Sequence, residues 1–257
     1  MRFGIIDRED NLSVKKRKSI IERLTSIGWM YDIENPELVI SIGGDGTLLR
    51  AIHYYIDILD SVMFVAIHTG TLGFLTDYTN DEIDQFIQDI TTKKPDIESR
   101  PMLEIQIPQK NQTCYALNDI RIESLGKTLS LDVYIDDEYF ENTSGSGLCI
   151  STQAGSSAIN RALSGAVVDS GLNVLQLCEI MPISHKNHHT LRNPYIMKED
   201  RIITIQGDSL SLARANYDHL DTGLEDVDVI YIKTSEKKVR FARYRTYSYL
   251  KRLKNLY

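Results

Sequence analysis

Apolar runs alternate with helix-like segments over the first hundred residues. Phe3–Ile6, Leu38–Ile42 and Val62–Ile67 are almost entirely apolar, which is typical of parallel strands covered by helices on both faces. The segments between them carry apolar residues three and four positions apart, first Ile20, Ile21, Leu24 and Ile27 before Gly28, then Leu48, Leu49 and Ile52. This alternation predicts a doubly wound α/β domain over residues 1–100.

A third helix is predicted after Asn80, which would cap it, with Asp81 and Glu82 complementing the helix dipole. Its apolar residues fall on one face, namely Ile83, Phe86, Ile87 and Ile90. The polar stretch Thr91–Asp96 then separates this domain from a region of different character.

Residues 101–244 show short strands with frequent alternation and few helices. The predicted strands are Leu103–Ile107, Cys114–Ile122, Leu129–Ile135, Leu148–Ser151, Arg201–Ile205 and Val227–Ile232, with one helix over about Ser156–Leu163. Several short strands with so few helices predict an antiparallel, β-sandwich-like second domain.

Composition excludes several classes of function. The 257 residues carry a net charge of −7, which argues against a nucleic-acid-binding protein or a protein of anionic membranes. No apolar run approaches the roughly 20 residues of a membrane-spanning helix. Cys114, Cys149 and Cys178 are odd in number and widely spaced, as expected for free thiols in the cytoplasm.

The strand Leu38–Ile42 breaks directly into Gly43-Gly44-Asp45-Gly46 before a helix-like segment that begins at Thr47. Glycines let backbone approach a ligand, and the free N–H groups of a helix start favour phosphate. Strand-to-helix turns also need glycine for geometry alone. The glycines by themselves therefore favour a structural role and a functional role equally. The carboxylate favours function, because beside phosphate its natural task is to hold or deprotonate a hydroxyl.

A second glycine-rich loop, His68–Thr76, follows the next strand. Carboxyl ends of parallel strands meet at one edge, so we expect the two loops to border one crevice. Phe74 is a candidate to face a planar ring, although core packing is the commoner role of a single Phe.

Two polar segments stand out in the second domain. Asn118 and Asp119 fall inside the predicted strand Cys114–Ile122, where they either face solvent at an edge or bind a base edge and a sugar hydroxyl. The hydroxyl-rich Ser151–Ala158 is either a helix cap or a ligand site at a helix end.

Two further features carry weaker signals. His185, His188 and His189 lack a nearby Cys or acid to complete a zinc site, and Lys186 would oppose a cation, so we interpret them as loop residues and predict no metal site. The basic, tyrosine-rich segment Lys237–Lys254 is more consistent with an intramolecular or subunit contact than with RNA binding, given the acidic chain.

Together these motifs resemble the NAD kinase family, which phosphorylates NAD to NADP, over most of the chain. Gly43-Gly44-Asp45-Gly46 is similar to its GGDG motif, His68–Phe74 to its second glycine loop, and Asn118-Asp119 to its Asn-Glu pair. Gly147–Ala158 resembles its TPTGSTAY-like segment, Asp218-His219 its late Asp motif, and Arg240–Arg245 the ending of short Gram-positive forms.

The resemblance implies that Asp45 is catalytic and that ATP, or another phosphoryl donor, phosphorylates the adenosine ribose 2′-hydroxyl with Mg²⁺ or another divalent cation. It also implies that a tail, about 245–257, rejoins the first domain and that the chain forms a homotetramer or homodimer. Gly43 and Gly44 would bind phosphate. The implied substrate-binding residues are Gly46, Phe74, Asn118, Asp119, Ser146, Ser157, Ala158, Ile159, Ala162, Asp218 and His219.

The chain departs from the family pattern in two places. Gln153, Ala154, Ser156, Ser157 and Ile159 replace the usual residues of the TPTGSTAY-like segment, and Ser144 and Ser146 replace Arg and Asp of an RGDG-like run. These departures leave open a degenerate NAD(P)-binding regulator. A lipid kinase of the diacylglycerol or sphingosine type, which shares a similar GGDG turn, is the main enzyme alternative.

Overall fold

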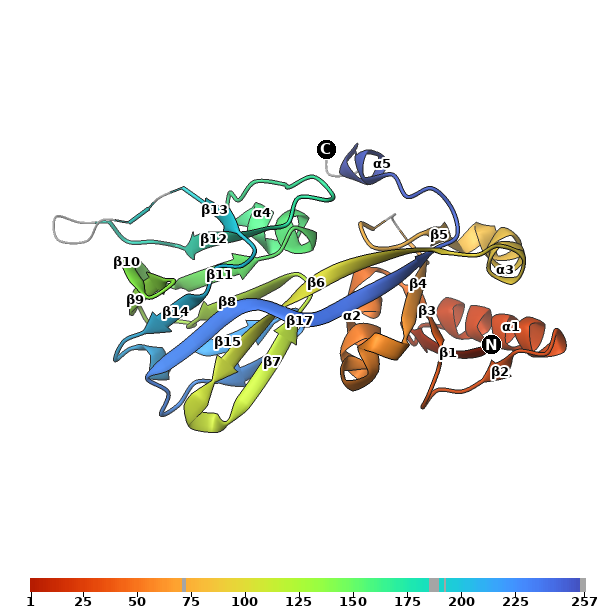
Figure 1. Cartoon of the computed structure of the whole chain (residues 1–257), viewed down its shortest axis with the longest axis horizontal. Helices are drawn as coiled ribbons and strands as arrows, with labels where there is room; N and C mark the ends of the chain where they lie inside the picture. The colour runs from red at the N-terminus through yellow and green to blue at the C-terminus, as the bar shows by residue number, and fades with distance from the viewer. Residues whose placement is uncertain (71–72, 185–189, 192, 255–257) are drawn as a thin grey trace. The chain divides into compact units, whose positions relative to one another are not determined.

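The computed structural model describes residues 1–70, 73–184, 190–191 and 193–254, which divide into two compact units (Figure 1). Unit 1 comprises Met1–Arg100 together with Lys237–Tyr257, and unit 2 comprises Pro101–Glu236. The segment that returns to unit 1 is longer than the tail expected from about residue 245. The reason is that strand β17 (Val229–Arg243) continues past residue 237 and pairs with unit 1 at Phe241↔Phe64.

Unit 1 is a parallel sheet with helices, as the apolar runs predict. The strand order is β17-β4-β3-β1-β2, and every pairing along it is parallel. The strands are β1 (Arg2–Asp7), β2 (Met30–Tyr31), β3 (Leu38–Gly43), β4 (Met63–His68) and β5 (Tyr78–Thr79). The helices are α1 (Asn11–Ser26), α2 (Asp45–Tyr54), α3 (Ile83–Thr92) and α5 (Tyr249–Leu253), with 3₁₀ turns at Ile56–Ser61 and Asn80–Glu82.

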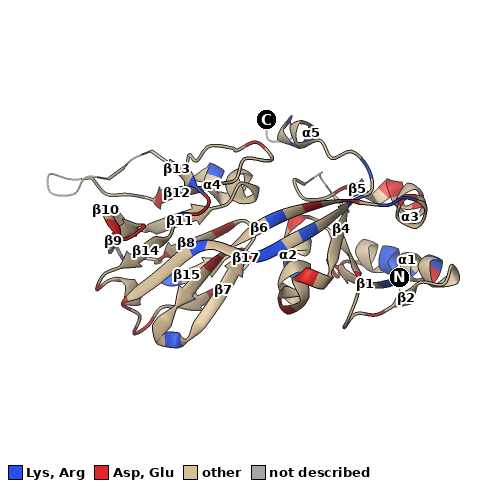
Figure 2. Ribbon diagram, in the orientation of Figure 1, with Lys and Arg blue, Asp and Glu red and all other residues tan. Residues whose placement is uncertain are grey.

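Helices cover both faces of this sheet. All six residues of β3 are buried, and one hydrophobic cluster takes alternate β3 residues together with apolar residues of α1 and α3, among them Ile40, Leu24 and Phe86. The buried Leu48 and Ile52 of α2 lie outside that cluster, so α2 packs against the opposite face. On the outer surface, basic residues of α1 lie beside acidic residues of α3 (Figure 2), as in the 2.8 Å Arg23–Asp84 ion pair.

The N-terminal signal of α3 differs from the predicted one. The cap is Thr79, not Asn80, and it forms a capping box in which the Glu82 carboxylate accepts the Thr79 backbone N–H at 2.8 Å. The first turn is a 3₁₀ turn that leads directly into α3. The reciprocal pair satisfies two backbone N–H groups, whereas the side chain of a single Asn80 cap would satisfy one.

Unit 2 is antiparallel. One sheet has the order β13-β12-β11-β8-β15-β16, and a second brings together β10, β9, β14 and β17, while β6 pairs with β7. The strands are β6 (Asp96–Ile107), β7 (Gln112–Ala116), β8 (Asp119–Glu123), β9 (Leu129–Ile135), β10 (Glu138–Gly145), β11 (Gly147–Ser151), β12 (Val174–Ile180), β13 (Tyr195–Lys198), β14 (Ile203–Gln206), β15 (Arg214–Tyr217) and β16 (Leu220–Gly223). 3₁₀ turns cover Pro108–Lys110, Ala154–Ser157 and Leu210–Leu212, and α4 covers Ile159–Ala162.

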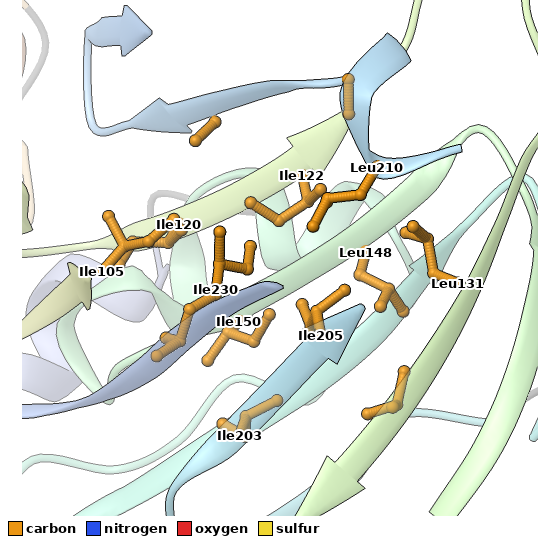
Figure 3. Packing of buried hydrophobic residues seen from close by; sticks show 14 of the residues in the cluster. Ile105, Ile120, Ile122, Leu131, Leu148, Ile150, Ile203, Ile205, Leu210 and Ile230 are labelled. Atoms are coloured by element: carbon orange, nitrogen blue, oxygen red, sulfur yellow. The ribbon is translucent and has the colours of Figure 1, made fainter. Parts of the chain in front are cut away.

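The core of unit 2 is aliphatic and lies between the two sheets (Figure 3). Ile120 and Leu148 from the first sheet lie in the same cluster as Leu131, Ile205 and Ile230 from the second, and all five are fully buried. Sheets that bury one apolar face against each other form a sandwich, which confirms the predicted fold class of this region.

Two predicted elements of unit 2 are wrong. The strand expected over Cys114–Ile122 is two strands, because the chain leaves β7 after Ala116 and enters β8, in the other sheet, at Asp119. The helix expected over Ser156–Leu163 is only a 3₁₀ turn and one α-turn, which are separated by Ala158 at φ −88°, ψ −133°. Side chains that bond local backbone compete with helix there, as Asn160 does with the Ser156 carbonyl at 3.1 Å.

No helix in the described part of the chain is long and apolar enough to cross a membrane.

Candidate functional site

The glycine turn of unit 1 lies at the carboxyl end of β3 and opens into α2. Gly44 is the N-cap and provides no side-chain cap, so the first turn of α2 keeps free backbone N–H groups. A methyl group added at Gly43 would lie 2.1 Å from the Thr47 hydroxyl oxygen, whereas Gly44 and Gly46 face open space within 4 Å. Gly43 is therefore needed for packing, while Gly44 and Gly46 leave backbone accessible to a ligand.

Asp45 is the first residue of α2, so the helix begins two residues earlier than Thr47. Its carboxylate accepts the backbone N–H of Phe74 at 2.7 Å and that of Leu75 at 3.0 Å, one on each oxygen. The two glycine loops thus meet at one edge of the sheet, as the strand order requires. Each carboxylate oxygen keeps a further lone pair for a third group.

The surroundings of Asp45 act on its pKa in two directions. Burial raises the pKa, while the two backbone N–H groups and the positive charges of Arg252 and Arg100 favour the ionised form. The net shift is upward. A carboxyl group with a raised pKa is a better proton acceptor than an ordinary Asp.

The C-terminal segment supports the loop that holds Asp45. The Tyr247 hydroxyl donates to the Phe74 carbonyl at 2.5 Å, and the Arg252 guanidinium donates to the Thr76 carbonyl at 2.5 Å. Arg243 binds the Asp77 carboxylate through its Nη1 at 2.7 Å, with both side chains buried. Arg243 and Arg252 therefore make intramolecular contacts, one of the two roles predicted for this segment. The Phe74 ring lies edge-on to Tyr249, with 5.6 Å between ring centroids.

In unit 2, two segments far apart in sequence converge on the backbone of Leu117 and Asn118. The Asp218 carboxylate accepts the backbone N–H groups of Leu117 and Asn118, each at 2.8 Å. The Thr152 hydroxyl donates to the Leu117 carbonyl at 2.6 Å. A methyl group at Gly155 would lie 2.0 Å from the Asn118 carbonyl oxygen, so the serine-rich turn packs tightly against this backbone.

Asn118 presents an unused polar atom at this junction. Its Oδ1 is buried and has no hydrogen-bond partner among the described residues. A buried polar atom without a partner is costly, which is consistent with a group that bonds a ligand. Asn118 lies between β7 and β8 and not inside a strand.

Asp119 is buried, with 4% of its surface exposed. Burial raises the pKa of its carboxyl group to about 7, the charge of Asp218 adds to this shift, and Arg121, whose Nε lies 3.2 Å away, opposes it. The folded protein therefore binds the Asp119 proton more tightly than an unfolded chain, in which the pKa is near its ordinary value of 3.8.

This shift predicts a pH dependence of stability. Because the folded state binds more protons between about pH 4 and 7, the Asp119 contribution to the free energy of unfolding falls as pH rises through that range. Asp119→Asn should therefore gain stability relative to wild type on going from pH 5 to pH 8, as measured by urea unfolding at both values. Parallel pH dependences of the two proteins would contradict the shifted pKa.

Side chains that replace the family residues hold the serine-rich turn in shape. The Ser156 hydroxyl donates to the Gln153 carbonyl at 2.7 Å and accepts the Val168 N–H at 3.0 Å, and the Gln153 amide donates to the Val168 carbonyl at 2.9 Å. Ser157 is half-buried, while Ala158 and Ile159 are exposed. The substituted positions thus build the turn and leave its Ala158–Ile159 edge uncovered.

Of the predicted site residues, Ser146 lies away from Asn118. Ser146 precedes β11, at the end opposite Ser151, so about 17 Å of strand separates them. Its backbone N–H bonds the Ile180 carbonyl at 2.9 Å. Ala162 ends α4, and His219, in the turn after β15, is exposed.

The metal prediction concerns residues that are only partly described. His185, His188 and His189 lie outside the described residues, as do Thr71 and Leu72 of the second glycine loop and residues 255–257 of the tail. In the rest of the chain, no group of three or more His, Cys, Asp or Glu side chains has the arrangement of a metal site. The three cysteines are free and buried.

Sequence reasoning missed two arginines beside the glycine turn. Arg8 and Arg50 line an open pocket of about 320 Å³ together with Gly44, Gly46 and Thr47. The available signal was the spacing on α2, where Arg50 stands four residues after Gly46 and so projects from the same face.

Both halves of the chain match models of one protein family. The family model of the ATP-NAD kinase N-terminal domain matches residues 9–94, and that of the ATP-NAD kinase C-terminal domain matches residues 117–244. An NAD kinase of Lactobacillus gasseri is 36% identical over 247 residues, covering 95% of this chain and 92% of the relative. An NAD kinase of Staphylococcus epidermidis is 36% identical over 258 residues, covering 98% and 96%.

Two solved structures are similar in fold. An NAD kinase from Archaeoglobus fulgidus in complex with ATP has a TM-score of 0.79 at 22% identity, covering 100% of this chain and 97% of that one. A yeast NADH kinase complexed with NADH has a TM-score of 0.81 at 20% identity, covering 99% and 86%.

Proposed function

The chain belongs to the NAD kinase family, and from that membership we propose that Asp45 orients the 2′-hydroxyl of NAD's adenosine ribose and accepts its proton. The chain is a phosphotransferase that converts NAD to NADP. The match of both halves to the same family disfavours the lipid-kinase alternative.

One observation carries the role of Asp45. Its carboxylate is fixed by the Phe74 and Leu75 N–H groups at the start of a helix whose other free N–H groups suit phosphate. A hydroxyl that donates to this carboxylate is held beside the phosphoryl donor. Positioning of this kind supplies much of the catalysis in phosphoryl transfer.

Phosphoryl transfer to NAD forms one bond and breaks another. The ribose 2′-oxygen forms a bond to the γ-phosphorus of ATP, the bond from that phosphorus to the β,γ-bridging oxygen breaks, and ADP leaves. The proton of the 2′-hydroxyl passes to Asp45 and then to solvent. Since the transition state is loose, the proton is needed late, and a carboxylate of modest basicity suffices.

The adenosine end of NAD is assigned to unit 2. The unpartnered Oδ1 of Asn118 is suited to accept from an adenine amino group or a ribose hydroxyl, and Asp119 from a second hydroxyl. Asp218 fixes the backbone that carries both. Further contacts along the NAD molecule, proposed from the family resemblance, are Ser146, Ser157, Ala158, Ile159, Ala162, His219 and Phe74.

The divalent cation is proposed to arrive with the donor as MgATP. Among the described residues, no cluster of three or more His, Cys, Asp or Glu side chains has the arrangement of a metal site. We also propose a cytoplasmic location, in keeping with three free thiols, and a homodimer or homotetramer as in the family resemblance.

The test is direct. Purified protein is incubated with NAD, ATP and Mg²⁺, and NADP is detected with an NADP-specific dehydrogenase. We expect steady NADP formation that excess EDTA stops, while NAD binding measured by calorimetry survives EDTA. NAD binding without any product would support the degenerate regulator instead, and no NAD binding would point to a different acceptor.

A further inference from the structure

The backbone that donates two N–H groups to Asp45 has its carbonyl groups bonded by the C-terminal segment. Residues 74–77 lie between β4 and β5, outside helix and strand, so side chains take the place of partners that a sheet would supply. Tyr247 bonds the carbonyl of Phe74, Arg243 that of Leu75, Arg252 that of Thr76 and Arg245 that of Asp77. All of these residues belong to unit 1.

The peptide group between Phe74 and Leu75 connects Tyr247 directly to Asp45. Its carbonyl oxygen accepts from the Tyr247 hydroxyl at 2.5 Å, and its N–H donates to Asp45 Oδ1 at 3.0 Å. A trans peptide group is planar, and its C=O and N–H bonds point in opposite directions. Tyr247 and Asp45 therefore hold opposite ends of one rigid group, and a rotation of that group changes both hydrogen bonds together.

The Tyr247 ring is itself held by two arginines. The guanidinium carbon of Arg252 lies 4.0 Å from the ring centroid and that of Arg243 lies 4.3 Å from it, distances at which a cation is attracted to the ring face. Arg243 is buried and pairs with Asp77 and with Glu98, each at 2.7 Å. The Tyr247 hydroxyl therefore approaches the loop from a fixed direction.

We propose that Tyr247 is a positioning residue for phosphoryl transfer, which fixes the direction of the Asp45 carboxylate through the Phe74–Leu75 peptide group. The inference rests on the proposed function of Asp45. Hydrogen bonds in a chain polarise one another, so the Tyr247 bond also strengthens the N–H bond that Asp45 accepts. Because a misplacement of about 1 Å can cost about a hundredfold in rate, this contact on the far side of the peptide group affects turnover.

Tyr247→Phe tests the inference, because it removes the hydroxyl and keeps the ring that the arginines contact. We expect kcat for NADP formation to fall by about two- to tenfold, the range that corresponds to one hydrogen bond. KM for NAD and KM for ATP should stay within about twofold of wild type, since the lost contact acts in the transition state and not on substrate binding. An unchanged kcat would overturn the inference.

The matched control is Tyr244→Phe in the same segment. Tyr244 is 5% exposed, and its hydroxyl has no hydrogen-bond partner among the described residues. The control removes the same atom from a buried tyrosine of the same unit, so kcat should stay at the wild-type value. Equal losses of kcat in Tyr247→Phe and Tyr244→Phe would mean that the bond to Phe74 has no special role, which would overturn the inference.

A pH profile separates positioning from a loss of folded protein. In wild type, burial raises the pKa of Asp45, while the two backbone N–H groups and the charges of Arg252 and Arg100 lower it. A weaker Leu75 N–H bond raises that pKa further, so the acid limb of kcat in Tyr247→Phe should move to higher pH. A smaller fraction of folded enzyme would lower kcat by the same factor at every pH. A lower kcat with an unshifted acid limb would therefore overturn the inference.

Hydrogen exchange separates this inference from the catalytic role of Asp45. Exchange of the backbone amides of residues 74–76 is measured by mass spectrometry in wild type, Tyr247→Phe and Tyr244→Phe. We expect faster exchange in Tyr247→Phe alone, since its loop has lost a bond that holds it closed. An active Asp45→Asn variant would refute the role of Asp45 and leave this exchange result in place. Exchange at the wild-type rate in Tyr247→Phe would overturn the inference, whatever the role of Asp45.

Discussion

Asp45→Asn is expected to lower kcat for NADP formation by about 10²–10⁴-fold, the usual contribution of a general base. The amide cannot accept the proton of the 2′-hydroxyl, yet it has nearly the same shape as the carboxylate. NAD binding, measured by calorimetry, should therefore fall far less than turnover. The measurement is the initial rate of NADP formation at saturating NAD and ATP.

Asp45→Asn also loses a hydrogen bond within the protein, and the experiment must separate this loss of stability from the loss of the proton acceptor. Both oxygens of Asp45 accept a backbone N–H, from Phe74 and from Leu75, and an amide can accept only one of them. The loss of that bond costs about 1–3 kcal/mol, so the melting temperature of the variant should fall modestly. A folded variant with normal NADP formation would refute the role of Asp45.

Gly73→Ala is expected to produce the second large loss. A methyl group at Gly73 would lie 2.2 Å from Asp45 Oδ1 and 2.6 Å from its Cγ, so the carboxylate must move. A displacement of about 1 Å from the productive geometry can cost about a hundredfold in rate. We expect kcat to fall by roughly that factor, with NAD binding retained.

Gly70→Ala is the matched control in the same loop. Among the described residues, a methyl group there meets no heavy atom within 4 Å, and neither glycine has the left-handed backbone that disfavours Ala. The control should keep a kcat close to that of wild type. Equal losses in both variants would show that the loop tolerates no side chain and that the Gly73–Asp45 contact has no special role.

Local patterns in the sequence predict much of unit 1. The apolar runs specify β1, β3 and β4, because strands buried on both faces must be apolar throughout. The glycine turn follows from the break after Ile42, and its contact with the second loop follows from the rule for parallel strands. The capping box at Thr79 could also have been predicted from the sequence, since Glu82 follows Thr79 by three residues.

Contacts between distant segments explain what the sequence could not predict in unit 2. Apolar residues stand at alternate positions on both sides of the break, at Cys114 and Ala116 and again at Ile120 and Ile122, so the alternation does not mark the end of β7. The chain leaves the strand there, and the backbone N–H groups of Leu117 and Asn118 donate to the carboxylate of Asp218. Asp218 lies about a hundred residues further along the chain. The position of Asn118 between strands depends on that bond, which periodicity cannot reveal.

The two arginines were missed for a similar reason. Arg8 follows β1 and Arg50 lies in α2, and only the parallel pairing of β1 with β3 places both beside the glycine turn. Arg50 alone, in an amphipathic helix, has the ordinary pattern of an exposed residue.

The central claim is that the Asp45 carboxylate contacts the ribose 2′-hydroxyl, and a cycle of enzyme and substrate changes measures that contact directly. Dissociation constants of NAD and of its 2′-deoxyadenosine analogue are determined for wild type and for Asp45→Ala. We expect loss of the hydroxyl to weaken binding to wild type by about tenfold, as for a hydrogen bond to a charged group. The same loss should have little effect on Asp45→Ala. An equal ratio of the two constants in both proteins would contradict the contact.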